Sequence, residues 1–432
     1  MAWLLFILLN AALFIRPVDL FPDIDVQIYL CLMILCLLAS TWQLAAAINS
    51  RAFSRDPITC CVLGMLPAVV LSHLVHLQFG LTLDCVVRFA KVVVYYLLFV
   101  SLVDTLPRLQ SFFFWLSRFV IALTALALLQ SHEIINIPSL EACQQHDIDP
   151  ETGEAFVIPR LCSTGLFNDP NDLCNILVIG IVISLFVMIE LRRGFRRLLG
   201  LAPICMFLYA LKLTYSRGGL ITLTAGVMTF VLARFGRKKT LLVAVLLLPI
   251  MYVFFAGRQT TVDVSQDTSQ SRIQLWAEGL AVFRQAPLFG IGMDEYVERF
   301  RLVAHNSFVH TYVELGFFGG TLFSGAFYTC LWGLLRLSRH DVVFHDEEAR
   351  RLRPYILAMI SSYWVGLLAL SRSYTVPTYM MFGIVTVYLQ NAGVSSSVPA
   401  PRLDGSYVMR LLKFSVAWLI ILMVFTKLMV RW

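Results

Sequence analysis

Three basic side chains stand where polar segments meet long apolar runs. Arg217 lies in a Tyr-Ser-Arg-Gly-Gly stretch between two apolar segments, and Arg272 opens an amphipathic segment. His305 directly precedes an apolar run that begins at Ser307. A guanidinium offers paired, planar donors to phosphate oxygens, and an imidazole exchanges protons near neutral pH. Two arginines and a histidine therefore suit a site that holds a diphosphate and removes a proton beside it.

Each of these residues also has an ordinary structural explanation. An arginine at the end of a span commonly reaches toward lipid headgroups, as Arg217 would. Arg272 would then be one more solvated charge on a surface helix. A histidine at a helix start, such as His305, is commonly a cap or a satisfied polar group. Residue types and spacing alone leave both explanations open.

Further polar residues lie within or beside the apolar segments. Arg88 and Lys91 are three residues apart, with Asp84 one turn earlier, so one face of that segment carries charge inside the membrane. This face is either an internal ion-pair network or part of a phosphate site. Asn171 lies in an Asn-Asp-Pro-Asn-Asp turn that is typical of a helix cap. The other candidates for substrate binding are Arg258, Asn306 and Arg372.

The composition is that of a polytopic membrane protein. Of 432 residues, 59% are hydrophobic and 14% are charged, whereas a soluble domain is about 45–50% apolar and about 25% charged. We therefore expect one all-α membrane domain over residues 1–432, with about twelve or thirteen spans. The net charge of +7 comes from short basic runs between apolar segments, so it does not indicate nucleic-acid binding.

The apolar segments define the expected spans, and the basic loops define their orientation. The spans are expected near 3–15, 26–48, 58–77, 82–104, 110–130, 171–190, 198–215, 218–234, 240–256, 307–335, 354–371, 375–391 and 411–430. The first is interpreted as a span and not as a cleaved signal, and the last could instead lie along the membrane surface. Arginine-rich blocks at 192–197, 234–239 and 336–353 are expected in the cytoplasm. The loops 131–170 and 257–306 then lie outside, the second with an amphipathic helix over 271–283 on the membrane surface.

Cysteines and common motifs add little further chemistry. Most of the ten cysteines lie in apolar runs, where the residue behaves as a small hydrophobe. Cys143 and Cys162 fall in the polar 131–170 loop, where a disulfide is chemically allowed if that loop is outside. The sequence contains no Cys-x-x-Cys pair, Walker motif or His-Glu-x-x-His motif, so we expect neither a metal nor a cofactor.

Several blocks together resemble the O-antigen ligase/O-antigen polymerase superfamily. They are Ser-Arg-Ile-Gln-Leu-Trp at 271–276, Ala-Pro-Leu-Phe-Gly-Ile-Gly at 286–292 and Ala-His-Asn-Ser-Phe at 304–308. Nine residues after His-Asn follows Gly-x-x-Gly at 316–319, and the turns at 167–172 and 215–219 are also similar to that family. One departure is that Gly320 precedes Thr321, where the ligases tend to place Thr directly. This departure bears on the choice between ligase and polymerase and not on membership.

The resemblance implies a GT-C-like, metal-independent glycosyltransferase in the bacterial inner membrane, with its active site facing the periplasm. Arg217 and Arg272 would bind the diphosphate of an undecaprenyl-linked glycan donor, and His305 would deprotonate or orient the acceptor hydroxyl, with inversion at the anomeric carbon. Our leading interpretation is an O-antigen ligase with lipid A–core as the acceptor. One alternative is an O-antigen or exopolysaccharide polymerase that uses the same chemistry. An alternative of another class is a polysaccharide transporter or flippase, which should show internal repeats that this sequence lacks.

Overall fold

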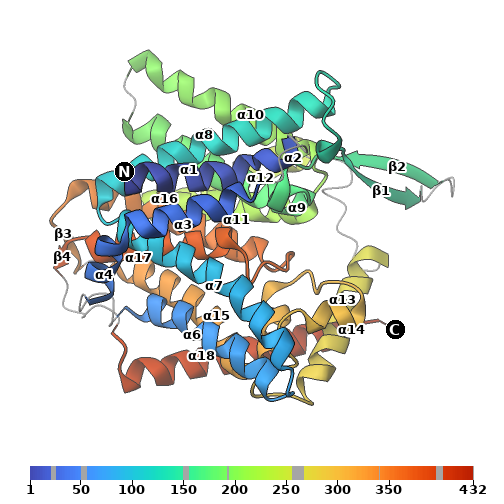
Figure 1. The fold of residues 1–432 in the computed structure, drawn as a ribbon. Helices are drawn as coiled ribbons and strands as arrows, with labels where there is room; N and C mark the ends of the chain where they lie inside the picture. Colours follow the sequence, from blue (N-terminus) through green and yellow to red (C-terminus); the bar gives the residue numbers. More distant parts are fainter. Residues whose placement is uncertain are drawn as a thin grey trace. The chain divides into compact units, whose positions relative to one another are not determined.

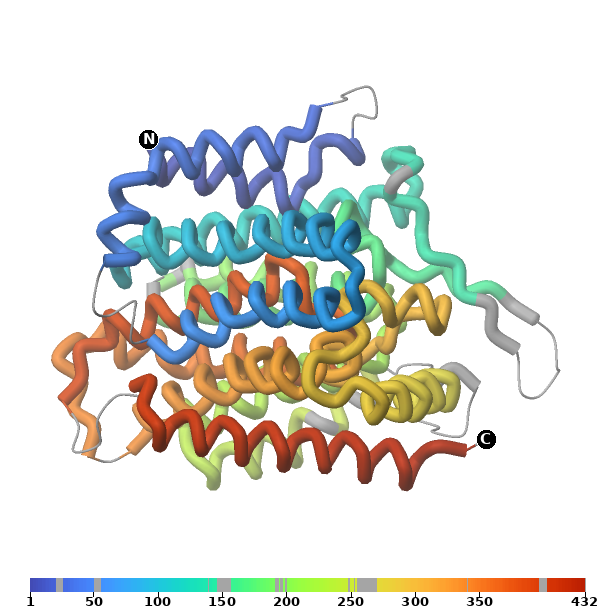
Figure 2. The backbone as a smooth tube through the Cα atoms, turned by 60° about the horizontal axis from the view of Figure 1, so that its bottom comes forward, coloured from blue at the N-terminus to red at the C-terminus, as the bar shows by residue number. Residues whose placement is uncertain are grey.

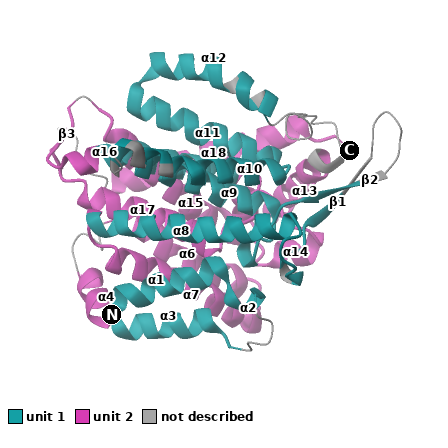
Figure 3. Ribbon diagram, turned by 90° about the horizontal axis from the view of Figure 1, so that it is seen from above, with its two compact units in different colours: residues 1–39, 107–261, 351–366 teal, residues 40–106, 262–350, 367–432 magenta. Residues whose placement is uncertain are grey.

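The computed structural model describes residues 1–20, 26–49, 56–148, 155–191, 194–254, 267–339, 341–395 and 402–431. Over these residues the chain is an all-α polytopic membrane protein, as its composition predicts. Its strands form two short antiparallel pairs, β1 (Cys143–Ile148) with β2 (Ala155–Arg160) and β3 (Val343–Phe344) with β4 (Val394–Ser395). The fold divides into two compact units that are each assembled from segments distant in the sequence (Figure 3).

Unit 1 contains residues 1–39, 107–261 and 351–366. Its helices are α1 (Ala2–Ile15), α2 (Pro17–Leu20), α3 (Ile28–Ala39), α8 (Leu106–Ser131), α9 (Pro170–Phe186), α10 (Leu201–Leu213), α11 (Arg217–Phe235), α12 (Arg237–Phe254) and most of α16 (Glu347–Gly366). Short turns are η1 (Pro138–Leu140), η2 (Gly165–Phe167), the π-helical η3 (Val187–Leu191) and η4 (Gly194–Gly200). Both α10 and α11 pack on α9, which is buried along most of its length.

Unit 2 contains residues 40–106, 262–350 and 367–432. Its helices are α4 (Thr41–Asn49), α6 (Pro57–Leu74), α7 (Phe79–Leu102), α13 (Asp267–Phe283), α14 (Glu295–Phe300), α15 (Ser307–Arg336), α17 (Val376–Asn391) and α18 (Gly405–Met429). The long helix α15 contacts α6, α13, α17 and α18. In Figure 2 the yellow helix α13 lies beside the C-terminal end of the red α18, where Gln274 Nε2 donates to the Arg431 carbonyl at 2.6 Å.

Among the described residues, seven helices are long and apolar enough to cross a membrane: α6, α7, α8, α9 continued to Glu190, α11, α15 and α18. Helices α3 and α4 would add an eighth span as one pair, with a bend of 66° between them. This count is lower than the expected twelve or thirteen. Helices α1, α10 and α17 are shorter than a span, and α12 and α16 begin with charged turns. An apolar run in the sequence marks burial, and a buried run becomes a span only where one helix continues through it.

Helix α15 is broken at Gly316, whose φ of 67° lies in the left-handed region. The segment 287–292 pairs with the backbone exposed by this break. Phe317 N donates to the Pro287 carbonyl at 2.7 Å. A Cβ at Gly316 would stand 2.4 Å from the Leu288 carbonyl, so only glycine fits there. The glycine-containing blocks at 286–292 and 316–319 are therefore two sides of one contact.

The amphipathic helix of the second long loop is present as α13, but it lies differently from the expectation. Ile273, Leu280 and Phe283 are buried, and α13 contacts α15 and α18. Its apolar face therefore packs on protein and not on the membrane surface. Trp276, expected at headgroup level, is half-buried and hydrogen-bonded within unit 2.

The loop 131–170 contains a hairpin that the sequence pattern did not predict. Strands β1 and β2 pair in antiparallel register, with Cys143 opposite Arg160 (Figure 1). Polar residues dominate β1, so it lacks the alternation of apolar and polar residues that normally marks a strand. The hairpin extends away from the helices of unit 1 (Figure 1).

Candidate functional site

The helix that follows His305 begins with a strong cap. Asn306 is buried, and its Oδ1 accepts hydrogen bonds from Phe308 N at 3.0 Å and Val309 N at 3.2 Å. Asn is among the preferred N-cap residues because its side-chain oxygen satisfies otherwise unpaired helix N–H groups. Asn306 therefore sets the start of α15, and its side-chain oxygen is occupied by two N–H groups of the first helical turn.

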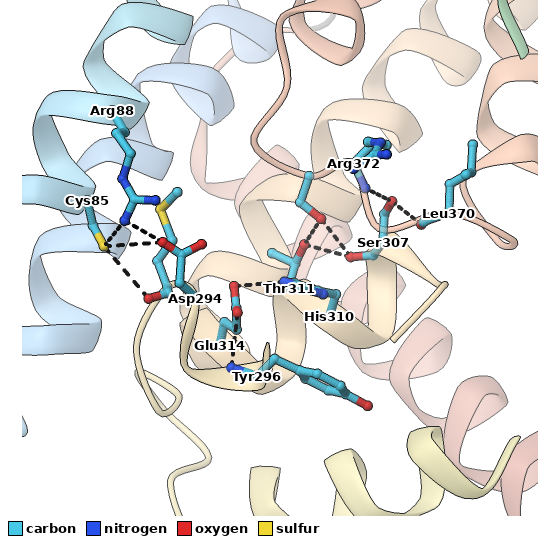
Figure 4. Close-up of polar contacts among 12 residues, drawn as sticks. Cys85, Arg88, Asp294, Tyr296, Ser307, His310, Thr311, Glu314, Leu370 and Arg372 are labelled. Carbon is cyan, nitrogen blue, oxygen red and sulfur yellow. Dashed lines mark hydrogen bonds and ion pairs between the residues drawn. The ribbon is translucent and has the colours of Figure 1, made fainter. Parts of the chain in front are cut away.

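The segment containing Arg372 is anchored to the same helix start (Figure 4). Ser307 Oγ donates to the Leu370 carbonyl at 2.6 Å and accepts from Arg372 N at 2.9 Å. Ser373 Oγ donates to the Ser307 carbonyl at 2.9 Å. The backbone of Arg372, a predicted substrate-binding residue, is thus anchored to Ser307, which lies two residues after His305. Its side chain is half-buried.

His305 occupies a strained backbone conformation. Its φ is 50°, in the left-handed region that residues with a Cβ rarely adopt, and its side chain is half-buried. Strained residues of this kind concentrate at functional sites. The preceding carbonyl, that of Ala304, accepts from Trp276 Nε1 at 2.6 Å. The indole of α13 therefore holds the turn that presents the histidine.

Helix α13 also brings Arg272 toward this turn. Arg272 lies four residues before Trp276, so the two side chains share one face of the helix. Because Trp276 contacts the residue next to His305, Arg272 is placed within about one helical turn of that contact. Arg272 is half-buried. Arg272 and His305 therefore belong to the same unit, in which Trp276 of α13 contacts the residue that precedes His305.

The indole donor of Trp276 gives a first test of this arrangement. Trp276→Phe keeps an aromatic ring near Phe425 but removes the hydrogen bond to Ala304. A neutral hydrogen bond contributes about 1 kcal/mol, so we expect a loss of up to about tenfold in kcat for transfer with an intact fold. Trp332→Phe, on α15 in the same unit, is the matched control and should retain the full rate. A full rate in Trp276→Phe would contradict a role for this contact.

A buried contact between a histidine and a carboxyl group lies further along α15 (Figure 4). His310 Nε2 is 3.0 Å from Glu314 Oε2, and these side chains are 8% and 0% exposed. Glu314 Oε1 accepts from Tyr296 N at 3.3 Å, and the Tyr296 ring stacks on His310 with centroids 5.2 Å apart. His310 therefore packs against Tyr296 and also lies beside a buried carboxyl group.

Tyr296 links this pair to α13. Burial, with the nearby Glu278 and Glu314 carboxylates, raises the pKa of Tyr296 well above its ordinary value. The phenol therefore remains a neutral donor, and its hydroxyl donates to the Leu275 carbonyl at 2.6 Å. Gly279 allows the ring to approach α13 closely, since a Cβ there would stand 2.8 Å from the Tyr296 ring.

The charged face of α7 pairs with the loop that precedes α14. Arg88 Nη2 lies 2.5 Å from Asp294 Oδ2 and also donates to Cys85 Sγ at 3.3 Å (Figure 4). Asp84, the neighbour suggested by the sequence, is exposed. For Arg88 this geometry favours the ion-pair interpretation, with a partner far away in the sequence. Lys91 is half-buried one turn further along the helix.

Arg217 belongs to unit 1, where it is the first residue of α11. The turn before it is strained, because Tyr215 has a φ of 49°. Ser216 caps the helix by accepting from Gly219 N at 3.0 Å, and its Oγ donates to Asn171 Oδ1 at 2.6 Å. Asn171, predicted to bind substrate, is thus hydrogen-bonded to the turn that carries Arg217.

Arg258 and the Cys143–Cys162 pair were also candidates in the sequence. Arg258 lies outside the described residues. The disulfide allowed between Cys143 and Cys162 is not formed, and both are free thiols. Cys143 is exposed, whereas Cys162 is buried and donates to the Glu141 carbonyl at 3.1 Å. Burial raises the pKa of the Cys162 thiol, which keeps it protonated and unreactive.

Sequence reasoning missed Glu314 and Asp294. The spacing of four residues between His310 and Glu314 was a usable signal, since it places both on one face of an apolar helix. Asp294 offered none, because nothing in the sequence connects it with Arg88. Within the described ranges, no group of three or more His, Cys, Asp or Glu side chains is placed to hold a metal ion.

The fold and these contacts define a polytopic α-helical membrane protein with a strained histidine at the head of a broken span. Residues 202–324 match the family model described as O-antigen ligase, which supports the resemblance to the O-antigen ligase superfamily over that segment. The matched segment contains Arg217, Arg272 and His305. No curated protein matches the chain. This match supports a ligase-like, glycan-transferring function in general terms, in a chain whose helices suit a membrane.

Proposed function

We propose that this protein transfers a glycan from undecaprenyl diphosphate to an acceptor hydroxyl at the periplasmic face of a bacterial inner membrane. The observation that carries the proposal is the strained His305 turn, held by Trp276 of the helix that also bears Arg272. The family match over 202–324 supports glycan transfer as the reaction class. A base beside a fixed guanidinium is the arrangement that this reaction requires.

In the proposed reaction the acceptor oxygen attacks the anomeric carbon of the donor sugar. The bond from that carbon to the diphosphate oxygen breaks, and its electron pair leaves with the diphosphate. His305 takes the proton of the acceptor hydroxyl, and Arg272 and Arg217 neutralise the charge that develops on the leaving group. A direct displacement of this kind inverts the anomeric centre. The scheme requires no metal, because the guanidiniums supply the positive charge.

We propose lipid A–core as the acceptor, which would make the enzyme an O-antigen ligase. The alternative acceptor is a second lipid-linked glycan, which would make it a polymerase with the same chemistry. The sequence feature that favours this alternative is Gly320, which stands between Gly319 and Thr321 where the ligases tend to have Thr directly. Only the acceptor differs between the two proposals, so only the product distinguishes them.

The test is an in vitro assay in which the full chain, in membrane vesicles, receives a defined undecaprenyl-linked donor and both acceptors in competition. We expect glycan on lipid A–core, at a rate unchanged by EDTA. Glycan joined only to the second lipid-linked glycan would establish the polymerase instead. Movement of the donor across the vesicle membrane without any new glycosidic bond would overturn the proposal in favour of a flippase. Strong inhibition by EDTA would contradict the metal-independent scheme.

A further inference from the structure

We propose that Arg160 is a positioning residue that holds the turn carrying Arg217 and connects this turn to the β1–β2 hairpin. The inference rests on the proposed role of Arg217 at the donor diphosphate. It concerns only residues of unit 1.

The Arg160 side chain bridges three separate elements. Its Nε donates to the Thr214 carbonyl at 2.8 Å, in the turn between α10 and α11. Its Nη1 donates to Gln145 Oε1 at 3.0 Å, in strand β1. Its Nη2 lies 3.5 Å from Asn171 Oδ1, in the first turn of α9. One planar guanidinium therefore ties a strand, a helix start and a turn together.

The acceptors of Arg160 also fix the start of α11, whose first residue is Arg217. Asn171 Oδ1, which faces Arg160, also accepts from Ser216 Oγ at 2.6 Å. Thr214 precedes the strained Tyr215, and Ser216 N donates to Thr214 Oγ1 at 3.3 Å. Arg160 thus contacts the turn from both sides, through its backbone and through the Asn171 amide that binds the cap residue of α11.

Arginine is the appropriate residue for this position for two reasons. Its rigid fork presents donors in several fixed directions, which the single ammonium of lysine cannot reproduce. Its positive charge also lies at the C-terminal end of α10, since Thr214 is the C-cap residue of that helix. Cations are favourable at helix C-termini because the terminal carbonyls carry partial negative charge.

The expected consequence is an effect on the chemical step that passes through Arg217. A misplacement of about 1 Å at a catalytic group is enough to lower the rate about 100-fold. Without Arg160 the left-handed Tyr215 turn loses its side-chain link to the hairpin, and the Thr214 carbonyl loses the guanidinium donor. We therefore expect Arg217 to lose its alignment while the helices of unit 1 remain packed.

The test is a double-mutant cycle on the full chain in vesicles, with transfer from the undecaprenyl-linked donor as the readout. Arg217→Ala should lower kcat about 100-fold, and Arg160→Gln should lower it about 10- to 100-fold with little change in the KM for donor. The double variant should be no slower than Arg217→Ala alone, because Arg160 acts through Arg217. Arg160→Lys should remain impaired, since it keeps the charge and loses the fork.

Contrary outcomes separate this inference from the proposed function. If Arg217→Ala keeps the full rate, the proposed role of Arg217 is wrong. If Arg217→Ala is slow but Arg160→Gln is not, only the positioning role is wrong. Additive losses in the double variant, or full activity in Arg160→Lys, would also overturn it.

A milder variant keeps the test decisive if Arg160→Gln fails to fold. Gln145→Ala removes only the hairpin acceptor and should lower kcat roughly two- to fivefold, with no further loss in the Arg217→Ala background. Gln144→Ala, at the exposed neighbouring position of the same strand, is the matched control and should be unchanged. Equal rates for Gln145→Ala and Gln144→Ala would overturn the link between hairpin and turn.

Discussion

Replacing His305 with asparagine should lower glycan transfer by about 10²- to 10⁴-fold, the range over which a positioned general base acts. Asparagine is the informative replacement because it tolerates the left-handed conformation that His305 adopts, with φ of 50°. The turn held by Trp276 should therefore persist, and only the imidazole is lost. The measurement is the initial rate of transfer at saturating donor and acceptor, together with the thermal unfolding midpoint, which should not change.

The matched control for this variant is His345→Asn, an exposed histidine of the same unit that bonds Ser395. It should transfer glycan at the rate of the unaltered protein. If His305→Asn keeps more than about a tenth of that rate, the residue is not the base. The proton would then leave to another acceptor, and the strain at residue 305 would need a purely structural explanation.

The sequence predicted the parts of this region that depend on neighbouring residues. The amphipathic pattern over 271–283 lies in adjacent positions, and it is present as α13, whereas the capping role of Asn306, a predicted substrate-binding residue, emerged only from the structure. The hydropathy of the chain likewise predicted an all-α membrane protein. Local patterns of this kind need no knowledge of which segments meet, so they can be recognised in a single sequence.

Contacts between distant segments could not be predicted in the same way. Gly290 and Gly316 belong to separate sequence blocks, yet a Cβ at Gly290 would stand 2.3 Å from the Glu314 carbonyl, beside the break in α15. The partner of Arg88 is Asp294 and not the nearby Asp84, because the fold and not the spacing decides which charges meet. Helix length is limited in the same way, since apolar runs such as α17 are buried in helices shorter than a span.

Arg160 illustrates the same limit within the candidate site. In the sequence Arg160 is the single arginine of the loop 131–170, and its neighbours give no sign of a role. Its importance appears only when a hairpin absent from the hydropathy pattern brings it to the Thr214 carbonyl. Residues that position others are therefore harder to predict from a sequence than residues that react. Their role depends on contacts with distant segments and not on the type of the residue itself.

Replacing Glu314 with leucine should destabilise the protein by about 1–3 kcal/mol, the cost of leaving a buried donor without its acceptor. The carboxylate is fully buried, and His310 and the Tyr296 N–H both lose their acceptor when it is removed. Glu314→Gln should cost less, because its amide oxygen still accepts from Tyr296 N. The measurement is the free energy of unfolding in detergent or lipid micelles, with Glu298→Ala on the exposed face of α14 as the control.

Replacing His310 and Glu314 together tests whether the two side chains interact. In the double variant His310→Leu/Glu314→Leu neither side chain of the pair is left buried without the other, so the loss should be smaller than the sum of the two single losses by about 0.5–3 kcal/mol. A strictly additive result would mean that the two side chains do not interact. Because Glu314 also binds Tyr296 next to the 290–294 segment, its loss should loosen that segment and slow transfer even where the protein remains folded. A folded Glu314→Leu variant with an unchanged transfer rate would show that the pair serves stability alone.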